Sequence, residues 1–213
     1  MDSKEMAPGD IERKSFEIIA AELGDRTFPS LEAPIVKRVI HTTADFSFAD
    51  SLVFAHDAAA RALDALRAGA AVLTDTNMAL AGVSKPALAK LGCTAVCYMA
   101  DPDIAAAAKA SGTTRAVASM DKACSIEGPL VIAVGNAPTA LLRLCELMDA
   151  GEIAPAAVIG VPVGFVNVVE AKEELLSRDV PAIVARGRKG GSTVAAAIMN
   201  ALLYQLTRPG GPQ

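Results

Sequence analysis

The chain has 213 residues, of which 52% are hydrophobic but only 4% aromatic, and it carries a formal net charge of −4 with an isoelectric point near 5.2. This acidic balance gives no electrostatic basis for binding nucleic acid. The most apolar stretch, 153–169, is shorter than the roughly 20 residues of a membrane-spanning helix and contains two prolines and two glycines. We therefore expect no membrane segment, and the N-terminus lacks the apolar run of a signal peptide.

Residues 1–9 and 208–213 are expected to be disordered, and the intervening segment 10–206 contains no linker, which predicts a single domain. Two amphipathic helices come first. Their apolar stripes are Phe16, Ile19, Ala20 and Leu23 in one, and Ile35, Val36, Val39 and Ile40 in the other. A third helix is expected to follow Asp57, a residue type that suits the N-cap position.

From residue 70 onward, short apolar runs alternate with helical patterns. The runs are 70–73, 94–99, 130–134, 157–161 and 182–185. The helices are expected at about 85–91, 102–110, 115–124, 138–149, 168–178 and 192–206. This alternation predicts an α/β fold with a mainly parallel open sheet of about five strands and helices on both faces, preceded by the N-terminal helices. The order of the strands cannot be read from the sequence.

Four polar or glycine-rich loops each follow a predicted strand. They are LTDTNM (73–78), GNAPTAL (135–141), GVPVGFVN (160–167) and RGRKGGST (186–193). The carboxyl ends of parallel strands lie at one edge of the sheet, where ligands bind in open α/β folds. In the last loop three cations precede Gly190 and Gly191. A glycine pair lets the backbone approach a ligand, and a helix N-terminus attracts anions, so we expect an anion-binding site here.

Several common signatures are absent. No GxGxxG follows the first predicted strand of the sheet, and neither the phosphate-binding GxxxxGK[ST] pattern nor GxSxG or HExxH occurs. The four cysteines form no CxxC pair, and with only two histidines they do not suggest a structural zinc site. The sequence therefore predicts no metal and no nucleotide cofactor, and a reducing, cytoplasmic setting.

His41 and His56 are the two candidates for proton transfer near neutral pH. His41 ends the second predicted helix, whose C-terminus favours a protonated imidazole, as a general acid requires. The same position also fits a histidine that only satisfies the last helix carbonyls. His56 has no polar companions beyond Asp57 and is interpreted as structural or solvent-exposed. Cys93, Cys97 and Cys145 are interpreted as small buried hydrophobic residues.

Other candidates have two interpretations each. Asp75 fits either a turn or N-cap residue or a site residue. Arg115 opens a predicted helix, where a cation opposes the helix dipole, so an anionic ligand would explain it, although a surface arginine fits as well. Asn136 could simply start a helix together with Pro138.

Five segments in this order resemble the precorrin-8X methylmutase (precorrin isomerase) family of cobalamin biosynthesis: ERKSF (12–16), VIHTTADF (39–46), GNAPTAL, GVPVGFVN and RGRKGGS. The resemblance extends over about residues 10–206. It implies an isomerase that moves a methyl group from C-11 to C-12 of precorrin-8X or cobalt-precorrin-8, giving hydrogenobyrinate or cobyrinate. It further implies no cofactor, a tetrapyrrole substrate with many carboxylates, and a homodimer. Whether the substrate carries cobalt is left open.

The resemblance assigns the general acid to His41 and substrate contacts to Ser15 and Arg115. Charge and loop position extend the expected substrate site. These further residues are Thr42, Asp75, Asn136, Gly164, Arg186, Arg188, Gly190, Gly191 and Ser192, with Lys189 as an additional cation.

Two alternatives remain at this point. One is a phosphate- or nucleotide-binding α/β transferase that uses the 186–193 loop as an anion nest. The other is a corrinoid carrier that retains its ligand without chemistry, and such a carrier would not need His41.

Overall fold

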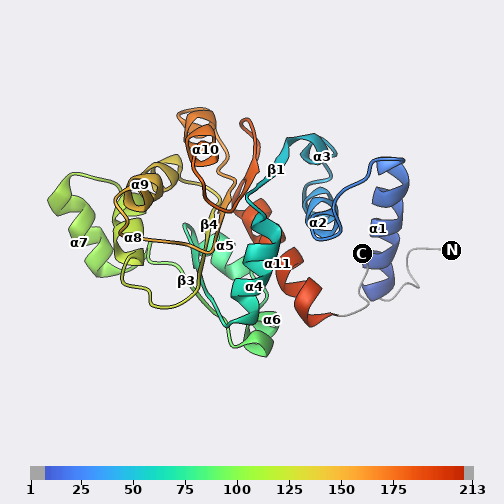
Figure 1. Ribbon diagram of the computed structural model, residues 1–213, viewed down its shortest axis with the longest axis horizontal. Coiled ribbons are helices and arrows are strands. Elements are labelled where there is room, and N and C mark those ends of the chain that lie inside the picture. Colours follow the sequence, from blue (N-terminus) through green and yellow to red (C-terminus); the bar gives the residue numbers. More distant parts are fainter. Residues whose placement is uncertain (1–7, 209–213) are drawn as a thin grey trace.

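Residues 8–208 are described by the computed structural model and contain a six-stranded sheet covered by helices on both faces (Figure 1). The strand order is β1-β6-β5-β4-β2-β3. Five strands are parallel: β2 (Ala71–Thr74), β3 (Thr94–Val96), β4 (Leu130–Val134), β5 (Ala157–Gly160) and β6 (Ala182–Ala185). The predicted α/β class and all five predicted strands are confirmed.

The sequence analysis missed a sixth strand, β1 (Leu52–Ala55), which pairs antiparallel with β6 at the sheet edge. Its four residues, LVFA, are all apolar and all half-buried, so the sequence shows no alternation of apolar and polar residues by which an edge strand is recognised. Two short helices, α3 (Phe48–Ser51) and α5 (Asn77–Gly82), were also missed, because one or two turns are too short to show a helical period.

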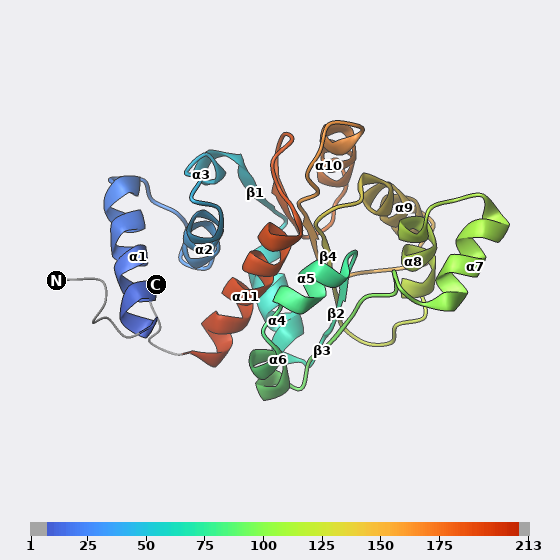
Figure 2. The same cartoon turned by 180° about the vertical axis from the view of Figure 1, so that it is seen from behind.

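Besides α3, ten helices surround this sheet within residues 8–208. On one face lie α1 (Pro8–Leu23), α2 (Ala33–Thr43), α4 (Ala58–Arg67), α5, α6 (Lys85–Leu91) and α11 (Ser192–Thr207). On the other lie α7 (Pro102–Ser111), α8 (Arg115–Ala123), α9 (Pro138–Asp149) and α10 (Val168–Leu176). Figure 2 shows α1 and α7 at opposite ends of the molecule. No helix in this described range is long and apolar enough to span a membrane.

The structure differs from the expected chain ends and refines the expected N-cap of α4. The predicted disordered ends were too long, because α1 begins at Pro8 and the guanidinium of Arg208 stacks 3.6 Å from the ring centroid of Tyr204. Residues 1–7 and 209–213 of that prediction lie outside the described residues. Asp57 does precede α4, but its backbone is left-handed, with φ of 56°, and its side chain makes no capping hydrogen bond.

The parallel strands β4, β5 and β6 are buried along their whole length and separate two apolar cores, whereas the edge strand β3 is partly exposed. In β4, Val131 and Ala133 face the core under α2, α4 and α11, whereas Leu130, Ile132 and Val134 face the core under α8, α9 and α10. Strands that are buried on both sides read as continuous apolar runs. This explains why these strands were visible in the sequence.

The handedness of the connections decides which helix covers which face. Parallel crossovers are right-handed in nearly all proteins. The chain moves from β2 to β3 in one direction across the sheet, and from β3 through β4 and β5 to β6 in the other. Accordingly α5 and α6 cover one face, and α7 to α10 cover the opposite face. The loops after β2 and β4 therefore lead to opposite faces of the sheet. The carboxyl ends of these two neighbouring strands are where open sheets typically bind a ligand.

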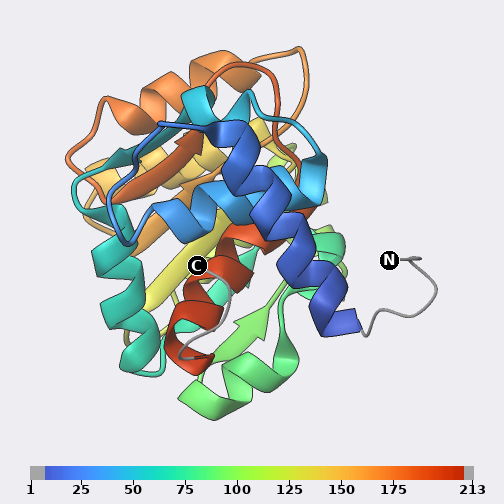
Figure 3. The same ribbon diagram turned by 90° about the vertical axis from the view of Figure 1, so that its right-hand side faces the viewer.

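α1 crosses over α2 at the outside of the molecule, and α2 in turn packs along α11 (Figure 3). α11 lies centrally on its face of the sheet and also contacts α4, α5 and α6. Its contact with α5 is close, because a Cβ added at Gly82 would lie 2.8 Å from the Cβ of Ala196. α11 is therefore surrounded by protein, and its N-terminus is fixed at the carboxyl edge of the sheet.

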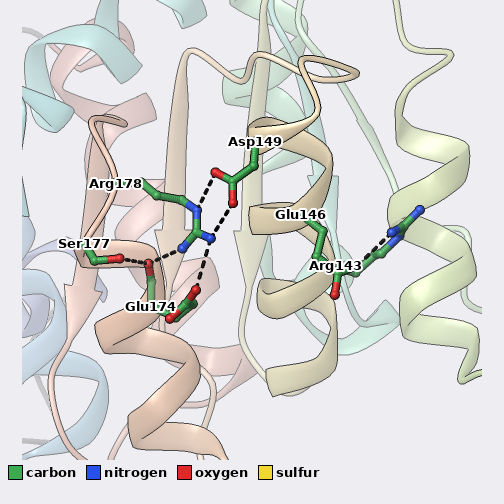
Figure 4. A network of polar contacts seen from close by, with 6 residues as sticks. All are labelled: Arg143, Glu146, Asp149, Glu174, Ser177 and Arg178. Carbon is green, nitrogen blue, oxygen red and sulfur yellow. Dashed lines mark hydrogen bonds and ion pairs between the residues drawn. The ribbon is translucent and has the colours of Figure 1, made fainter.

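Ion pairs tie the helices on the other face together (Figure 4). Arg178, just after α10, donates from Nε and Nη2 to the two carboxylate oxygens of Asp149 in α9, at 2.9 and 2.6 Å, and also pairs with Glu174. Arg143 of α9 donates to Asp121 of α8 at 2.6 Å. Partly exposed pairs of this kind each contribute little, about 0–1 kcal/mol, so the apolar core provides most of the cohesion on this face.

A buried carboxylate joins two of the loops at the carboxyl edge. Asp75 follows β2 and is only 1% exposed. Its Oδ1 accepts a hydrogen bond from the amide of Gly135, and its Oδ2 accepts from the amides of Asn136 and Ala137, all at 2.8 Å. Burial raises the pKa of Asp75, while these three hydrogen bonds act in the opposite direction. The carboxylate thus fixes the loop from which α9 begins.

Replacing Asp75 by Asn is expected to lower the free energy of unfolding by about 1–3 kcal/mol, because an amide NH₂ group would face backbone donors that then lack an acceptor. Urea unfolding at pH 7 measures this change. The matched control is Asp64→Asn, which removes an exposed carboxylate paired with Arg67 and should cost about 0–1 kcal/mol. Equal stability of the two variants would contradict this account of Asp75.

Candidate active site

The loops that follow β2, β4, β5 and β6 meet at the carboxyl edge, as the parallel sheet predicts. Thr76 Oγ1 lies 2.8 Å from Ser192 Oγ, which joins the loop after β2 to the start of α11. A Cβ added at Gly135 would lie 2.7 Å from Ser192 Cα, so the loop after β4 contacts the same turn backbone to backbone. The amide of Gly191 donates to the carbonyl of Val161 at 2.8 Å. The four loops form one continuous surface.

The glycines of this edge have a structural task that the sequence analysis did not predict. Gly190 has φ of 158°, and a Cβ added there would lie 2.1 Å from the carbonyl oxygen of Val161. Gly191 donates its amide to that same carbonyl, and Gly164, with φ of 146°, donates its amide to the carbonyl of Arg188 at 3.1 Å. The prediction that these glycines contact a ligand stays a prediction. These glycines let the loops after β5 and β6 cross closely.

Two of the predicted site cations already have carboxylate partners. Arg186 donates from Nε and Nη2 to the two carboxylate oxygens of Glu173 in α10, both at 3.1 Å. Lys189 Nζ donates to Asp45 Oδ2 at 2.5 Å and to Ser47 Oγ at 2.9 Å. The hydrogen bond from Lys189 is the main cause that lowers the pKa of Asp45 to about 2. Lys189 therefore ties the segment after α2 to the 186–193 loop.

The other two cations have no carboxylate partner among residues 8–208. Arg188 is exposed, and its guanidinium lies 5.4 Å from the ring centroid of Phe165. Arg115 is also exposed and is the first residue of α8. The preceding Thr114 Oγ1 lies 3.4 Å from Thr139 Oγ1 at the start of α9, which places Arg115 beside the loop after β4. Arg115 and Arg188 are thus the cations available to an anionic ligand.

His41 lies in the last turn of α2 and is half-buried. Its ring stacks on Phe16 of α1, with ring centroids 5.0 Å apart and planes inclined by 14°. The chain continues from α2 directly to Asp45, which contacts Lys189 of the 186–193 loop. The helix end that carries His41 is therefore fixed to the same edge of the sheet as the loops.

An aromatic and ionic cluster supports the Phe16 ring. The guanidinium of Arg38 lies 4.8 Å from the ring centroid of Phe16 and 5.0 Å from that of Tyr204 in α11. Arg38 also donates to Glu12 at 2.6 Å, and this hydrogen bond is the main cause that lowers the pKa of Glu12. The cluster links α1, α2 and α11 and restricts the orientation of the His41 ring through Phe16.

The remaining predicted residues differ in their availability. Ser15 and Thr42 donate their hydroxyl groups to carbonyls of their own helices, at 2.9 and 3.0 Å. Asn136 is exposed, and its backbone amide is held by Asp75. The prediction that Asp75 contacts substrate is corrected, because its side chain is buried and both of its oxygens accept backbone hydrogen bonds. Asp75 instead holds the backbone of the loop after β4.

The residues interpreted as structural lie away from this edge or are buried. His56 Nδ1 pairs with Asp179 at 2.9 Å, near the amino end of β6. Cys93 and Cys145 are buried, as predicted, whereas Cys97 is only half-buried, and burial raises the pKa of its thiol. No group of three or more His, Cys, Asp or Glu side chains within residues 8–208 is placed to hold a metal ion.

Sequence reasoning missed the exposed apolar side chains of the edge. Phe165 is 83% exposed and Val166 76%, next to the half-exposed Val163, and Met78 at the start of α5 is also exposed. The segment GVPVGFVN was recognised as a loop, and its large apolar residues were a signal of an exposed apolar surface, because loops run over the protein surface. They give this edge an apolar surface beside its cations.

A cavity of about 340 Å³ lies at the opposite, amino edge of the sheet. Its lining includes Asp149 and Arg178, which pair with each other, and contains none of the predicted site residues. The carboxyl edge is therefore the better candidate for an active site.

Comparison with known proteins finds similarity over nearly the whole chain. The family model for precorrin-8X methylmutase matches residues 10–205. A cobalt-precorrin-8 methylmutase of Salmonella typhimurium is 48% identical over 93% of this chain and 96% of its own length. A cobalt-precorrin-8 methylmutase of Priestia megaterium is 46% identical over 92% of this chain and 87% of its own length.

A solved structure gives the same result for the fold. The crystal structure of a precorrin-8X methylmutase from Thermus thermophilus superposes with a TM-score of 0.85 at 41% identity, and the match covers 94% of this chain and 98% of that one. Together these similarities show that the chain belongs to the precorrin-8X methylmutase family and is an isomerase, a methylmutase of cobalamin biosynthesis.

Proposed function

We propose that this methylmutase moves a methyl group from C-11 to C-12 of precorrin-8X or cobalt-precorrin-8, giving hydrogenobyrinate or cobyrinate, with His41 as the general acid. The observation that carries the proposal is the position of His41 on the segment that Lys189 fixes to the carboxyl edge, where Arg115 and Arg188 have no carboxylate partner among the described residues. Relatives named for cobalt-precorrin-8 and for precorrin-8X are both similar to this chain, so both substrates are kept.

The proposed role of His41 is to protonate the conjugated macrocycle. A protonated ring is electron-poor, which lowers the barrier to methyl migration, and later loss of the proton restores conjugation. A positioned general acid contributes about 10²–10⁴-fold to the rate. The stacked Phe16 ring supports this role, because it holds one face of the imidazole and fixes the direction of its nitrogens.

The substrate carboxylates and the ring faces need different partners. Arg115 and Arg188 can each bind a carboxylate through two parallel hydrogen bonds. The exposed apolar side chains Val163, Phe165 and Val166 offer a surface for the flat, apolar part of the macrocycle. Holding the ring in one geometry supplies a further part of the rate enhancement.

We also propose a homodimer in the cytoplasm. Ile11 and Ile18 lie seven residues apart on α1, hence on one helix face, and both are 49% exposed. Such a face suits burial against a second copy. All four cysteines are free, which suits a reducing compartment.

His41→Ala is expected to lower kcat by about 10²–10⁴-fold, because the general acid is lost, while the protein folds and binds hydrogenobyrinate as before. The visible spectrum follows turnover, since the conjugation of the macrocycle changes during the rearrangement. His56→Ala, which removes the other histidine, is the matched control and should keep normal turnover. Turnover by His41→Ala at the rate of the unmodified protein would refute the acid role.

Arg188→Met and Arg115→Met are each expected to weaken binding of hydrogenobyrinate by about tenfold or more, because a charge-assisted hydrogen bond is lost. The loss should be larger at low salt, where screening is weakest. Arg186→Met serves as the control, since Arg186 already pairs with Glu173, and its effect should be smaller. Titration calorimetry at two salt concentrations measures all three variants. A loss confined to Arg186→Met would show that the assignment of the cations is wrong.

A further inference from the structure

A lysine lies buried beneath the loop that carries Arg188. Lys172 in α10 is 0% exposed, and no carboxylate within residues 8–208 forms an ion pair with it. Burial lowers the pKa of its ammonium group to about 8. Buried charges are normally paired with an opposite charge or fully hydrogen-bonded, because removing a charge from water is costly. The contacts of Lys172 therefore need an explanation.

Within residues 8–208, the hydrogen bonds of the Lys172 ammonium group go to the backbone of the 186–193 loop. Its Nζ donates to the carbonyl of Gly187 and to the carbonyl of Lys189, both at 2.8 Å. The carbonyl between them, that of Arg188, accepts from the amide of Gly164 at 3.1 Å. Three successive carbonyls thus accept hydrogen bonds, two from one buried cation and one from the loop after β5.

This arrangement decides where the Arg188 side chain lies. With the peptide groups on both sides of residue 188 fixed, its side chain leaves the loop on the exposed side, over the ring of Phe165. The glycines cannot do this alone, because Gly187 and Gly190 leave the backbone free to adopt other conformations. A lysine with three donors can satisfy two carbonyls at once, whereas an apolar residue at this position would leave both without a donor.

We propose that Lys172 is a positioning residue, which holds the Gly187 and Lys189 carbonyls so that Arg188 faces the substrate. The expected effect of Lys172 on substrate binding rests on the proposed function. The structural part of the proposal, the fixing of the loop, stands on the two hydrogen bonds from Lys172.

The first experiment tests the loop without any substrate. In Lys172→Met, a side chain of similar length without a donor, hydrogen exchange should be faster at the amides of Gly164 and Gly191, which donate across the loops after β5 and β6. The exposed Lys90 on α6 provides the control variant, Lys90→Met, which should leave both amides protected. Unchanged exchange in Lys172→Met would overturn the inference.

The second experiment tests whether Lys172 acts through Arg188. KM for precorrin-8X is measured in Lys172→Met, Arg188→Met and the double variant. Lys172→Met should raise KM about tenfold with a smaller change in kcat, and this increase should largely vanish when Arg188 is already replaced, because residues in one network are non-additive. The same increase in both backgrounds would show that Lys172 does not act through Arg188, and would overturn the proposal.

A further variant covers the case in which Lys172→Met does not fold. Lys172→Gln keeps an NH₂ donor on a shorter side chain, which cannot reach both carbonyls. This variant should give a KM and exchange rates between those of Lys172→Met and of the unmodified protein. A KM and exchange rates equal to those of the unmodified protein would count against the proposal. If the unmodified protein itself neither binds nor converts precorrin-8X, the proposed function fails, and the exchange experiment still decides whether Lys172 fixes the loop.

Discussion

Two charged side chains are buried in the described part of the chain, Asp75 and Lys172, and both are satisfied by backbone groups of loops at the carboxyl edge. The carboxylate of Asp75 accepts from three amides before α9, and the ammonium of Lys172 donates to two carbonyls before α11. A buried polar group without a hydrogen-bond partner costs free energy, so each buried charge stabilises the loop conformation in which its hydrogen bonds form. The surface of the candidate site depends on these two buried charges.

The cations and the histidine at the carboxyl edge divide into two kinds. Lys189 and Arg186 are used within the protein, by Asp45 and Glu173. Arg115, Arg188 and His41 are left on the accessible side, next to the exposed apolar residues of the loop after β5. An acidic protein thus presents a local surface with cations, an imidazole and apolar groups. This combination suits a flat substrate that carries carboxylates at its periphery.

Much of the fold could be predicted because strands buried on both faces and helices with one apolar face leave different periods in the sequence. The antiparallel β1 could not, since its four half-buried residues show no alternation. The sequence analysis placed the candidate site at the carboxyl edge, because loop composition and strand ends coincide there, and this location stays a prediction. Its contacts were not predicted, because ion pairs such as Lys189 with Asp45 join residues far apart in the chain.

Lys172 shows what a closer analysis of the sequence could have found. It lies at i+4 from Val168 and shares the buried face of α10 with Ala171 and Leu175. A lysine at a core position of an amphipathic helix is a signal that a buried polar partner exists. The identity of that partner is a matter of tertiary structure. The glycine pair was predicted to approach a ligand, and its close contact with the Val161 carbonyl was not predicted.

The central claim is that a carboxylated macrocycle binds at the carboxyl edge, within reach of His41. A crystal structure of the protein with hydrogenobyrinate tests this most directly. The account predicts the ring over the loops after β4, β5 and β6, with carboxylates on Arg115 and Arg188 and the His41 imidazole in hydrogen-bond range of the macrocycle. A ring bound instead at the amino edge, near Asp149 and Arg178, with His41 remote from it, would contradict the account.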